Sequence, residues 1–151
     1  MNKRTKILTE IIAGLFILLF LYTALSKLSD MSRMELSIAK SPIIGDSANM
    51  VAWTVPTVEI MISALLFIPR FRYHGLVASF ILMLVFTIYV AGILAFADRL
   101  PCSCGGVISE MSWSVHLIFN IVFSLIALLG VWLHRSNKDF IAINRNSRIP
   151  V

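Results

Sequence analysis

The chain has 151 residues, of which 58% are hydrophobic and only 14% are Asp, Glu, Lys or Arg. In soluble domains about a quarter of all residues are charged. The low charged fraction and high hydrophobic fraction of this chain therefore exclude an ordinary soluble globule and indicate a membrane protein surrounded by lipid. The formal net charge is +5. Because the basic residues are scattered between apolar runs and form no nucleic-acid-binding motif, we expect no nucleic-acid partner.

Four apolar stretches are long enough to cross a bilayer, for which a helix needs about 20 residues. They predict helices at about residues 7–26, 50–69, 74–97 and 112–134. The two-residue alternation of a transmembrane β-barrel is absent. The sequence therefore predicts an all-α fold, a polytopic membrane four-helix bundle over residues 1–134. Residues 135–151 are expected to form a loosely ordered cytoplasmic tail.

Lys and Arg are unevenly distributed along this topology. Nine of the 13 lie on the side of the two termini and the turn at residues 69–74, and four lie on the other side. Cytoplasmic loops carry the excess of positive charge, so we expect a multi-pass protein of the cytoplasmic (inner) membrane with both termini inside. A cleaved signal peptide is the alternative for the first helix, but that apolar run exceeds the 7–15 residues typical of a signal peptide.

After the first helix the chain becomes amphipathic. Residues 30–40 place Met31, Met34 and Ile38 on one stripe, and Pro42 follows. This pattern predicts a short amphipathic helix on the outer surface. Such a helix could cover the following loops or lie among the lipid headgroups.

Several polar residues fall inside the predicted spans. Glu59 lies near the middle of the second span, where an ionised carboxylate is costly, so it should be protonated, paired or turned toward the bundle interior. The residues that we expect to share this interior, as candidate cofactor-binding residues, are Tyr22, Glu59, His116 and Asn120, with Lys27 as a further member. They could form a hydrogen-bonded core that fixes helix packing, or a quinone pocket or proton route.

The only two cysteines, Cys102 and Cys104, lie in a short polar segment after Pro101. At this spacing they could close a small, strained disulfide of the exchange-active kind, and the outer side of a cell membrane is oxidising. We therefore expect them to be catalytic in thiol–disulfide exchange. An inert disulfide and a Cu(I) site with nearby methionines are the alternatives. The sequence has no zinc-site spacing, and we expect no metal.

Taken together, these residues resemble the MauE/DoxX family of redox-associated membrane proteins over about residues 8–134. The similar positions are Tyr22-Thr23-Ala24-Leu25-Ser26-Lys27-Leu28, Ser41-Pro42, Glu59 and Pro101-Cys102-Ser103-Cys104-Gly105-Gly106. The resemblance implies a four-helix membrane bundle, disulfide formation in exported proteins and a thioredoxin-like partner. Within the family, MauE supports maturation of a disulfide-rich methylamine dehydrogenase subunit, and DoxX is linked to quinone-coupled sulfur oxidation.

A second cysteine pair, which membrane thiol oxidases use as an internal relay, is missing from this sequence. We therefore expect a membrane thiol–disulfide redox protein that works with an exported or thioredoxin-like partner, with quinone as the candidate cofactor. Two alternatives remain at this stage. One is a non-enzymatic accessory subunit of a larger envelope complex with a static disulfide, and the other is a Cu(I)-handling membrane protein.

Overall fold

The computed structural model describes residues 3–39, 45–96 and 112–146. All the regular structure in these ranges is helical, which confirms the all-α class. In chain order the elements are α1 (Lys3–Ser29), α2 (Met31–Ala39), the 3₁₀ turn η1 (Gly45–Ser47), α3 (Ala48–Phe67), α4 (Arg72–Phe96) and α5 (Trp113–Asn146).

Four of these helices, α1, α3, α4 and α5, are long and apolar enough to cross a membrane. Each leaves large apolar side chains exposed on its outward face, among them Leu18, Met61, Ile88 and Leu125. Such faces suit lipid, and helices satisfy their backbone hydrogen bonds internally, as a hydrocarbon environment requires. The chain is therefore a multi-pass membrane protein with the four spans that the sequence predicts.

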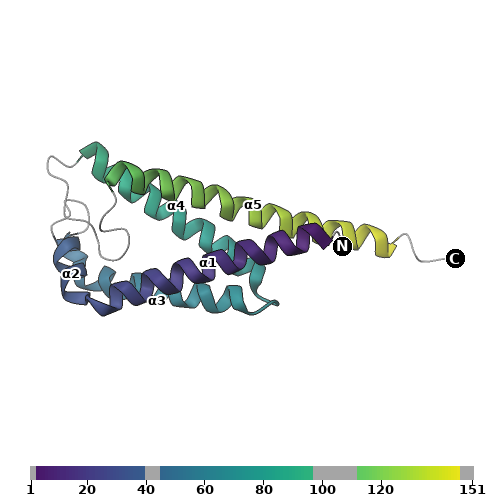
Figure 1. The fold of residues 1–151 in the computed structure, drawn as a ribbon, viewed down its shortest axis with the longest axis horizontal. Coiled ribbons are helices and arrows are strands. Elements are labelled where there is room, and N and C mark those ends of the chain that lie inside the picture. The colour runs from purple at the N-terminus through teal and green to yellow at the C-terminus, as the bar shows by residue number, and fades with distance from the viewer. Residues whose placement is uncertain (1–2, 40–44, 97–111, 147–151) are drawn as a thin grey trace.

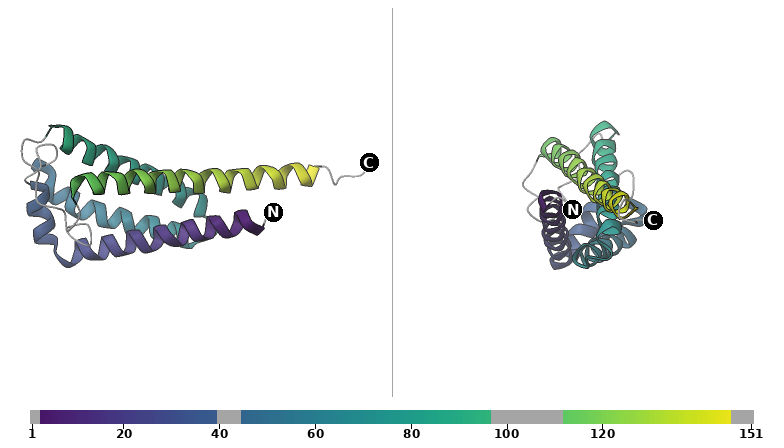
Figure 2. Two further views of the ribbon diagram at one scale, coloured as in Figure 1. Left: turned by 45° about the horizontal axis from the view of Figure 1, so that its top comes forward. Right: turned by 90° about the vertical axis from the view of Figure 1, so that its right-hand side faces the viewer.

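The four long helices form a ring in which α1 packs against α3, α3 against α4, α4 against α5, and α5 against α1. Figures 1 and 2 show that the described chain begins and ends at one end of the bundle, while α2 lies at the other. We call these the terminal end and the α2 end. A tight turn joins α3 to α4 at the terminal end, where the Phe71 N–H donates to the Ile68 carbonyl oxygen at 3.0 Å.

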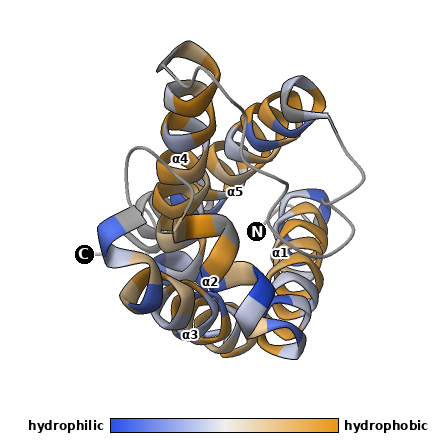
Figure 3. Cartoon of the chain, turned by 90° about the vertical axis from the view of Figure 1, so that its left-hand side faces the viewer, coloured by the Kyte–Doolittle hydropathy of each residue, from blue (hydrophilic) through white to orange (hydrophobic). Residues whose placement is uncertain are grey.

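Helix α2 crosses the α2 end of the bundle in front of α3 (Figure 3). Its apolar stripe is buried, because Met34 and Ile38 pack against Ala48 and Ala52 at the start of α3. The opposite face is exposed at Leu36. The apolar stripe of α2 is therefore used for packing on a neighbouring helix, and Met34 is a core residue.

Helix α5 is longer than its apolar segment. The sequence predicts a helix end near residue 134 and a loose tail, whereas α5 continues to Asn146 and its 34 residues are about 51 Å long. No Gly or Pro occurs between Gly130 and Pro150, so nothing in this stretch interrupts helical geometry. Loss of hydropathy marks where the span ends, and it does not mark where the helix ends.

The apolar core fills the part of the bundle toward the terminal end. Phe16, Leu66 and Leu76 are fully buried there, and the Phe16 ring meets the Phe123 ring edge to face with centroids 5.7 Å apart. Two glycines allow the close packing: a Cβ atom at Gly75 would lie 2.9 Å from the Leu66 backbone nitrogen, and one at Gly130 would lie 3.0 Å from the Ile12 side chain. This half of the bundle is packed mainly with apolar side chains.

Charged side chains connect the helices at the terminal end. Glu10, which the sequence places at the membrane boundary, lies 3.7 Å from the Arg72 guanidinium on α4 and 3.9 Å from the Lys6 ammonium. Its side chain is about half exposed. These are surface ion pairs, which contribute about 0–1 kcal/mol each.

Candidate functional site

A buried ion pair joins the two neighbouring helices α1 and α3. Lys27, in the last turns of α1, contacts Glu59 Oε1 near the middle of α3. Side chains in a helix tilt toward its N-terminus. Because α1 and α3 run in opposite directions, Lys27 leans into the bundle while Glu59 leans toward the α2 end, and the two charged groups meet.

The pair explains how Glu59 is tolerated at this depth. Its side chain is 1% exposed, and that of Lys27 is 14% exposed. A lone charge at the centre of a bilayer costs roughly 2.5–3.5 kcal/mol on insertion scales, so an opposite charge at contact distance is needed. The Lys27 ammonium also lies 5.5 Å from the centre of the Phe86 ring on α4, a cation–π arrangement.

Helix α5 contributes two further polar residues. His116 lies close enough to Lys27 for the two side chains to interact electrostatically. Asn120 follows one turn further along the same face and is 2% exposed. Below it, the Ser124 hydroxyl donates to the Asn120 carbonyl oxygen at 2.8 Å, and its oxygen lies 3.4 Å from the Thr87 hydroxyl. We call Lys27, Glu59, His116 and Asn120 the interior polar cluster.

Two atoms of this cluster are buried without a hydrogen-bond partner among the described residues. They are Glu59 Oε2, an acceptor, and the Asn120 Nδ2 amide, a donor. A buried polar group left unpaired costs about 1–3 kcal/mol, and native proteins contain few of them. The interior polar cluster therefore offers one acceptor and one donor to a further molecule.

Of the four expected cofactor-binding residues, Glu59 and Asn120 are buried in the bundle and His116 is partly buried near Lys27, whereas Tyr22 lies outside the interior. Tyr22 is 49% exposed on the outward face of α1. Lys27 takes its place, with Thr23 one turn before it beside the same Glu59 carboxylate. Periodicity could not choose between Tyr22 and Lys27, because α1 is apolar on nearly all sides, and only the fold shows that Phe16 and Phe20 mark its buried face.

Cys102 and Cys104, the expected catalytic residues, lie outside the described residues. The helices on either side of them are described. Helix α4 ends at Phe96 and α5 begins at Trp113, both at the α2 end (Figure 1). The cysteines thus lie in sequence between two helix ends at the α2 end. His116 and Asn120 are in the first turns of α5 at that same end.

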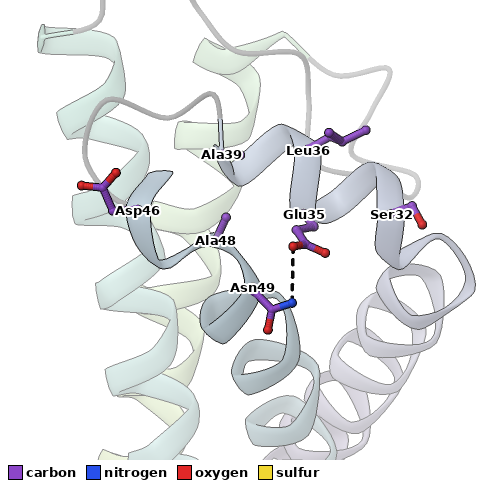
Figure 4. A pocket seen from close by; sticks show the side chains of 7 residues that line it. All are labelled: Ser32, Glu35, Leu36, Ala39, Asp46, Ala48 and Asn49. Carbon is purple, nitrogen blue, oxygen red and sulfur yellow. Dashed lines mark hydrogen bonds between the residues drawn. The ribbon is translucent and has the colours of Figure 1, made fainter.

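The surface of the α2 end is hollowed between α2 and the start of α3 (Figure 4). The hollow has a volume of about 610 Å³ and is lined by Ser32, Glu35, Leu36, Ala39, Asp46, Ala48 and Asn49. The Asn49 side-chain amide donates to Glu35 Oε1 at 3.3 Å across it. The sequence-based reasoning missed this feature, because it forms only where α2 folds back on α3.

Metal-ligand residues do not gather in the described ranges, where no group of three or more His, Cys, Asp or Glu side chains could hold an ion.

Comparison with known proteins gives one match. No curated protein and no solved structure matches the chain. The model of the family described as methylamine utilisation protein MauE matches residues 5–133, a range that includes most or all of each of the four spans, the interior polar cluster and both cysteines. The match supports the MauE part of the expected resemblance, and it does not extend to DoxX. The chain is a four-span membrane protein that belongs to the MauE family.

Proposed function

We propose that this protein is a membrane thiol–disulfide redox protein that supports disulfide formation in exported proteins through Cys102 and Cys104. The observation that carries the proposal is the position of α4 and α5. The two helices that flank the cysteines both reach the α2 end, beside the one described part of the bundle that contains buried ionisable side chains. Membership of the MauE family supports the same conclusion.

The proposed reaction is a pair of exchange steps. A thiolate of the partner protein attacks one sulfur of the Cys102–Cys104 disulfide, and a mixed disulfide forms as the other cysteine leaves as a thiolate. A second partner thiolate then displaces the first cysteine. The partner gains a disulfide, and Cys102 and Cys104 become a dithiol that holds two more electrons. To act again, the dithiol must pass two electrons and two protons to an acceptor.

The proposed site of this exchange is the outer face of the cytoplasmic membrane. The terminal end carries both chain ends and the turn between α3 and α4, with nine of the 13 basic residues along the sequence. Positive charge in short loops favours the cytoplasmic side. The α2 end then faces outward, where disulfides persist. The hollow beside α2 gives an exported or thioredoxin-like partner a concave surface at that end.

Thiol trapping in intact cells tests the proposal. Cells are quenched with acid, free thiols are alkylated with a reagent that adds mass, and mixed disulfides are resolved on non-reducing gels. We expect Cys102→Ser or Cys104→Ser to accumulate a mixed disulfide with an exported protein through the reverse exchange. The remaining cysteine thiolate attacks the disulfide of an oxidised partner, and the second cysteine, which would release the partner, is missing. The double variant should form none.

The matched control is Ser103→Ala, which changes the residue between the cysteines and keeps both thiols. It should behave like the unmodified chain. A pair that stays fully oxidised under added reductant, together with full function of the double serine variant, would contradict the exchange reaction. That result would instead identify the protein as an accessory subunit with a static disulfide.

A further inference from the structure

Most buried polar side chains of the described bundle form a hydrogen bond within their own helix. The hydroxyl groups of Thr9, Ser63, Ser79 and Ser124 each donate to a carbonyl oxygen one turn earlier in their own helix, at 2.8–2.9 Å. Glu59 Oε2 and Asn120 Nδ2 differ from them, since each is buried and has no partner in the described ranges. These two atoms therefore mark a place where the helices leave hydrogen bonds for something else.

The two unpartnered groups come from opposite sides of the ring. Glu59 extends from α3 and Asn120 from α5, which are diagonal helices, so both face the bundle interior. Lys27 extends from α1 toward both helices, since its ammonium contacts Glu59 and lies near His116, which is one turn before Asn120 in α5. Phe86 from α4 adds an aromatic wall beside the ammonium.

The chemistry of the site selects a class of ligand. Lys27 and Glu59 neutralise each other, so the pair favours a neutral ligand over a phosphate or a carboxylate. Glu59 in the ion pair can only accept a hydrogen bond, and Asn120 Nδ2 can only donate one. The ligand must therefore present one hydroxyl and one further oxygen, and Phe86 favours a flat ring. The core toward the terminal end is closed, so the ligand enters from the bilayer or from the α2 end.

We propose that the interior polar cluster binds the headgroup of a quinol, with one ring hydroxyl donating to Glu59 Oε2 and the other ring oxygen accepting from Asn120 Nδ2. The redox role of this ligand rests on the proposed function, and its binding does not. A dithiol that becomes a disulfide gives up two electrons and two protons, and a quinone that becomes a quinol takes up the same number. Because the Glu59 carboxylate cannot donate, the site holds the quinol more tightly than the quinone.

Binding of a short-chain ubiquinol to the purified full-length protein in detergent tests the inference by titration calorimetry under anaerobic conditions. We expect saturable binding that is about tenfold tighter for the quinol than for the quinone, since one hydrogen bond to a charged acceptor distinguishes them. Asn120→Leu should weaken quinol binding about tenfold. The same variant should unfold at an unchanged or higher temperature, because it removes an unpaired buried donor.

Ser79→Ala is the matched control, because Ser79 is equally buried on α4 but donates to Gly75 of its own helix. It should leave quinol binding unchanged. Absence of saturable binding to the unmodified protein, or unchanged quinol affinity in Asn120→Leu, would overturn the inference and leave water as the partner of the two atoms. If the Asn120 variant does not fold, a photoreactive quinone on the unmodified protein replaces it: labelling of α3 or α5 around the cluster supports the site, and labelling confined to other regions refutes it.

The double variant Cys102→Ser/Cys104→Ser separates this inference from the proposed function. It cannot exchange thiols, yet it should bind the quinol as tightly as the unmodified chain. Quinol binding without any mixed disulfide in cells would uphold the site and refute the exchange reaction. Mixed disulfides without quinol binding would do the reverse.

Discussion

At the scale of single residues, Lys27 holds the polar interior together. Its ammonium pairs with Glu59, faces the Phe86 ring and lies near His116, so one side chain touches or influences three other helices. Burial makes this pair different from the surface pairs at the terminal end. Both charges have left water, and the loss of either partner leaves the other uncompensated.

We expect Lys27→Met to lower the free energy of unfolding by about 3–5 kcal/mol, because Glu59 then stays buried without its counter-charge. The double variant Lys27→Met/Glu59→Met should recover most of this loss, since it removes both charges. Thermal unfolding in detergent, arranged as a double-mutant cycle, measures the coupling.

Lys6→Met supplies the comparison for that cycle. Lys6 also pairs with a glutamate, Glu10, but both side chains are about half exposed. We expect a change of only about 0–1 kcal/mol. Equal changes in the free energy of unfolding for the Lys6 and Lys27 substitutions would show that the buried ion pair contributes no more to stability than the exposed one.

At the scale of helices, the closeness of packing varies sharply between pairs of neighbouring helices. The space around three glycines shows this variation. Gly75 lies where α4 meets the backbone of α3, Gly130 lies where α5 meets flexible side chains of α1 and α4, and Gly14 has nothing within 4 Å of an added Cβ atom. A backbone contact cannot give way as a side chain does. The three positions therefore form a graded series on membrane-spanning helices.

We expect Gly75→Ala to destabilise the bundle by about 1–3 kcal/mol, because the new methyl group overpacks against the Leu66 backbone. Gly130→Ala should cost less, since the ends of Ile12 and Leu76 can move aside. Gly14→Ala should be neutral or stabilising by up to about 1 kcal/mol through helix propensity. Unfolding temperatures of the three variants in one detergent give the order, and a reversed order would contradict the α3–α4 packing.

At the scale of the whole molecule, the bundle is asymmetric along its length. The half toward the terminal end is closed by Phe16, Leu66 and Leu76, whereas the interior polar cluster occupies the middle and the part toward the α2 end. Under the proposed orientation, the packed apolar core lies between the interior polar cluster and the cytoplasm.

Cysteine accessibility checks that orientation. In a Cys102→Ser/Cys104→Ser background, Ser47→Cys at the α2 end should react with a membrane-impermeant maleimide in intact cells. Ser136→Cys, at the last residue of the fourth span toward the terminal end, should react only after the membrane is permeabilised. Both native residues are exposed, so access depends on the side of the membrane alone. The opposite labelling pattern would place the α2 end in the cytoplasm.

The sequence by itself determined the four spans and the interior position of Glu59. The length and apolar character of a span are local properties, and the cost of a charge in hydrocarbon is the same whichever helices surround it. The buried face of α1 could not be read in this way, because apolar residues surround this helix and only the fold places Phe16 and Phe20 inside and Leu18 outside. The end of α5 was not readable from hydropathy, because the helix continues beyond the membrane span.

Only the tertiary structure decided which groups meet. Lys27 rather than Tyr22 reaches Glu59 because α1 and α3 are antiparallel neighbours whose side chains lean toward each other. Met34 and Ile38 face α3 instead of lipid because α2 folds back across the bundle. The unpaired atoms of Glu59 and Asn120 also depend on the tertiary structure, because contacts between segments far apart in the chain determine which buried groups in the described residues have a hydrogen-bond partner.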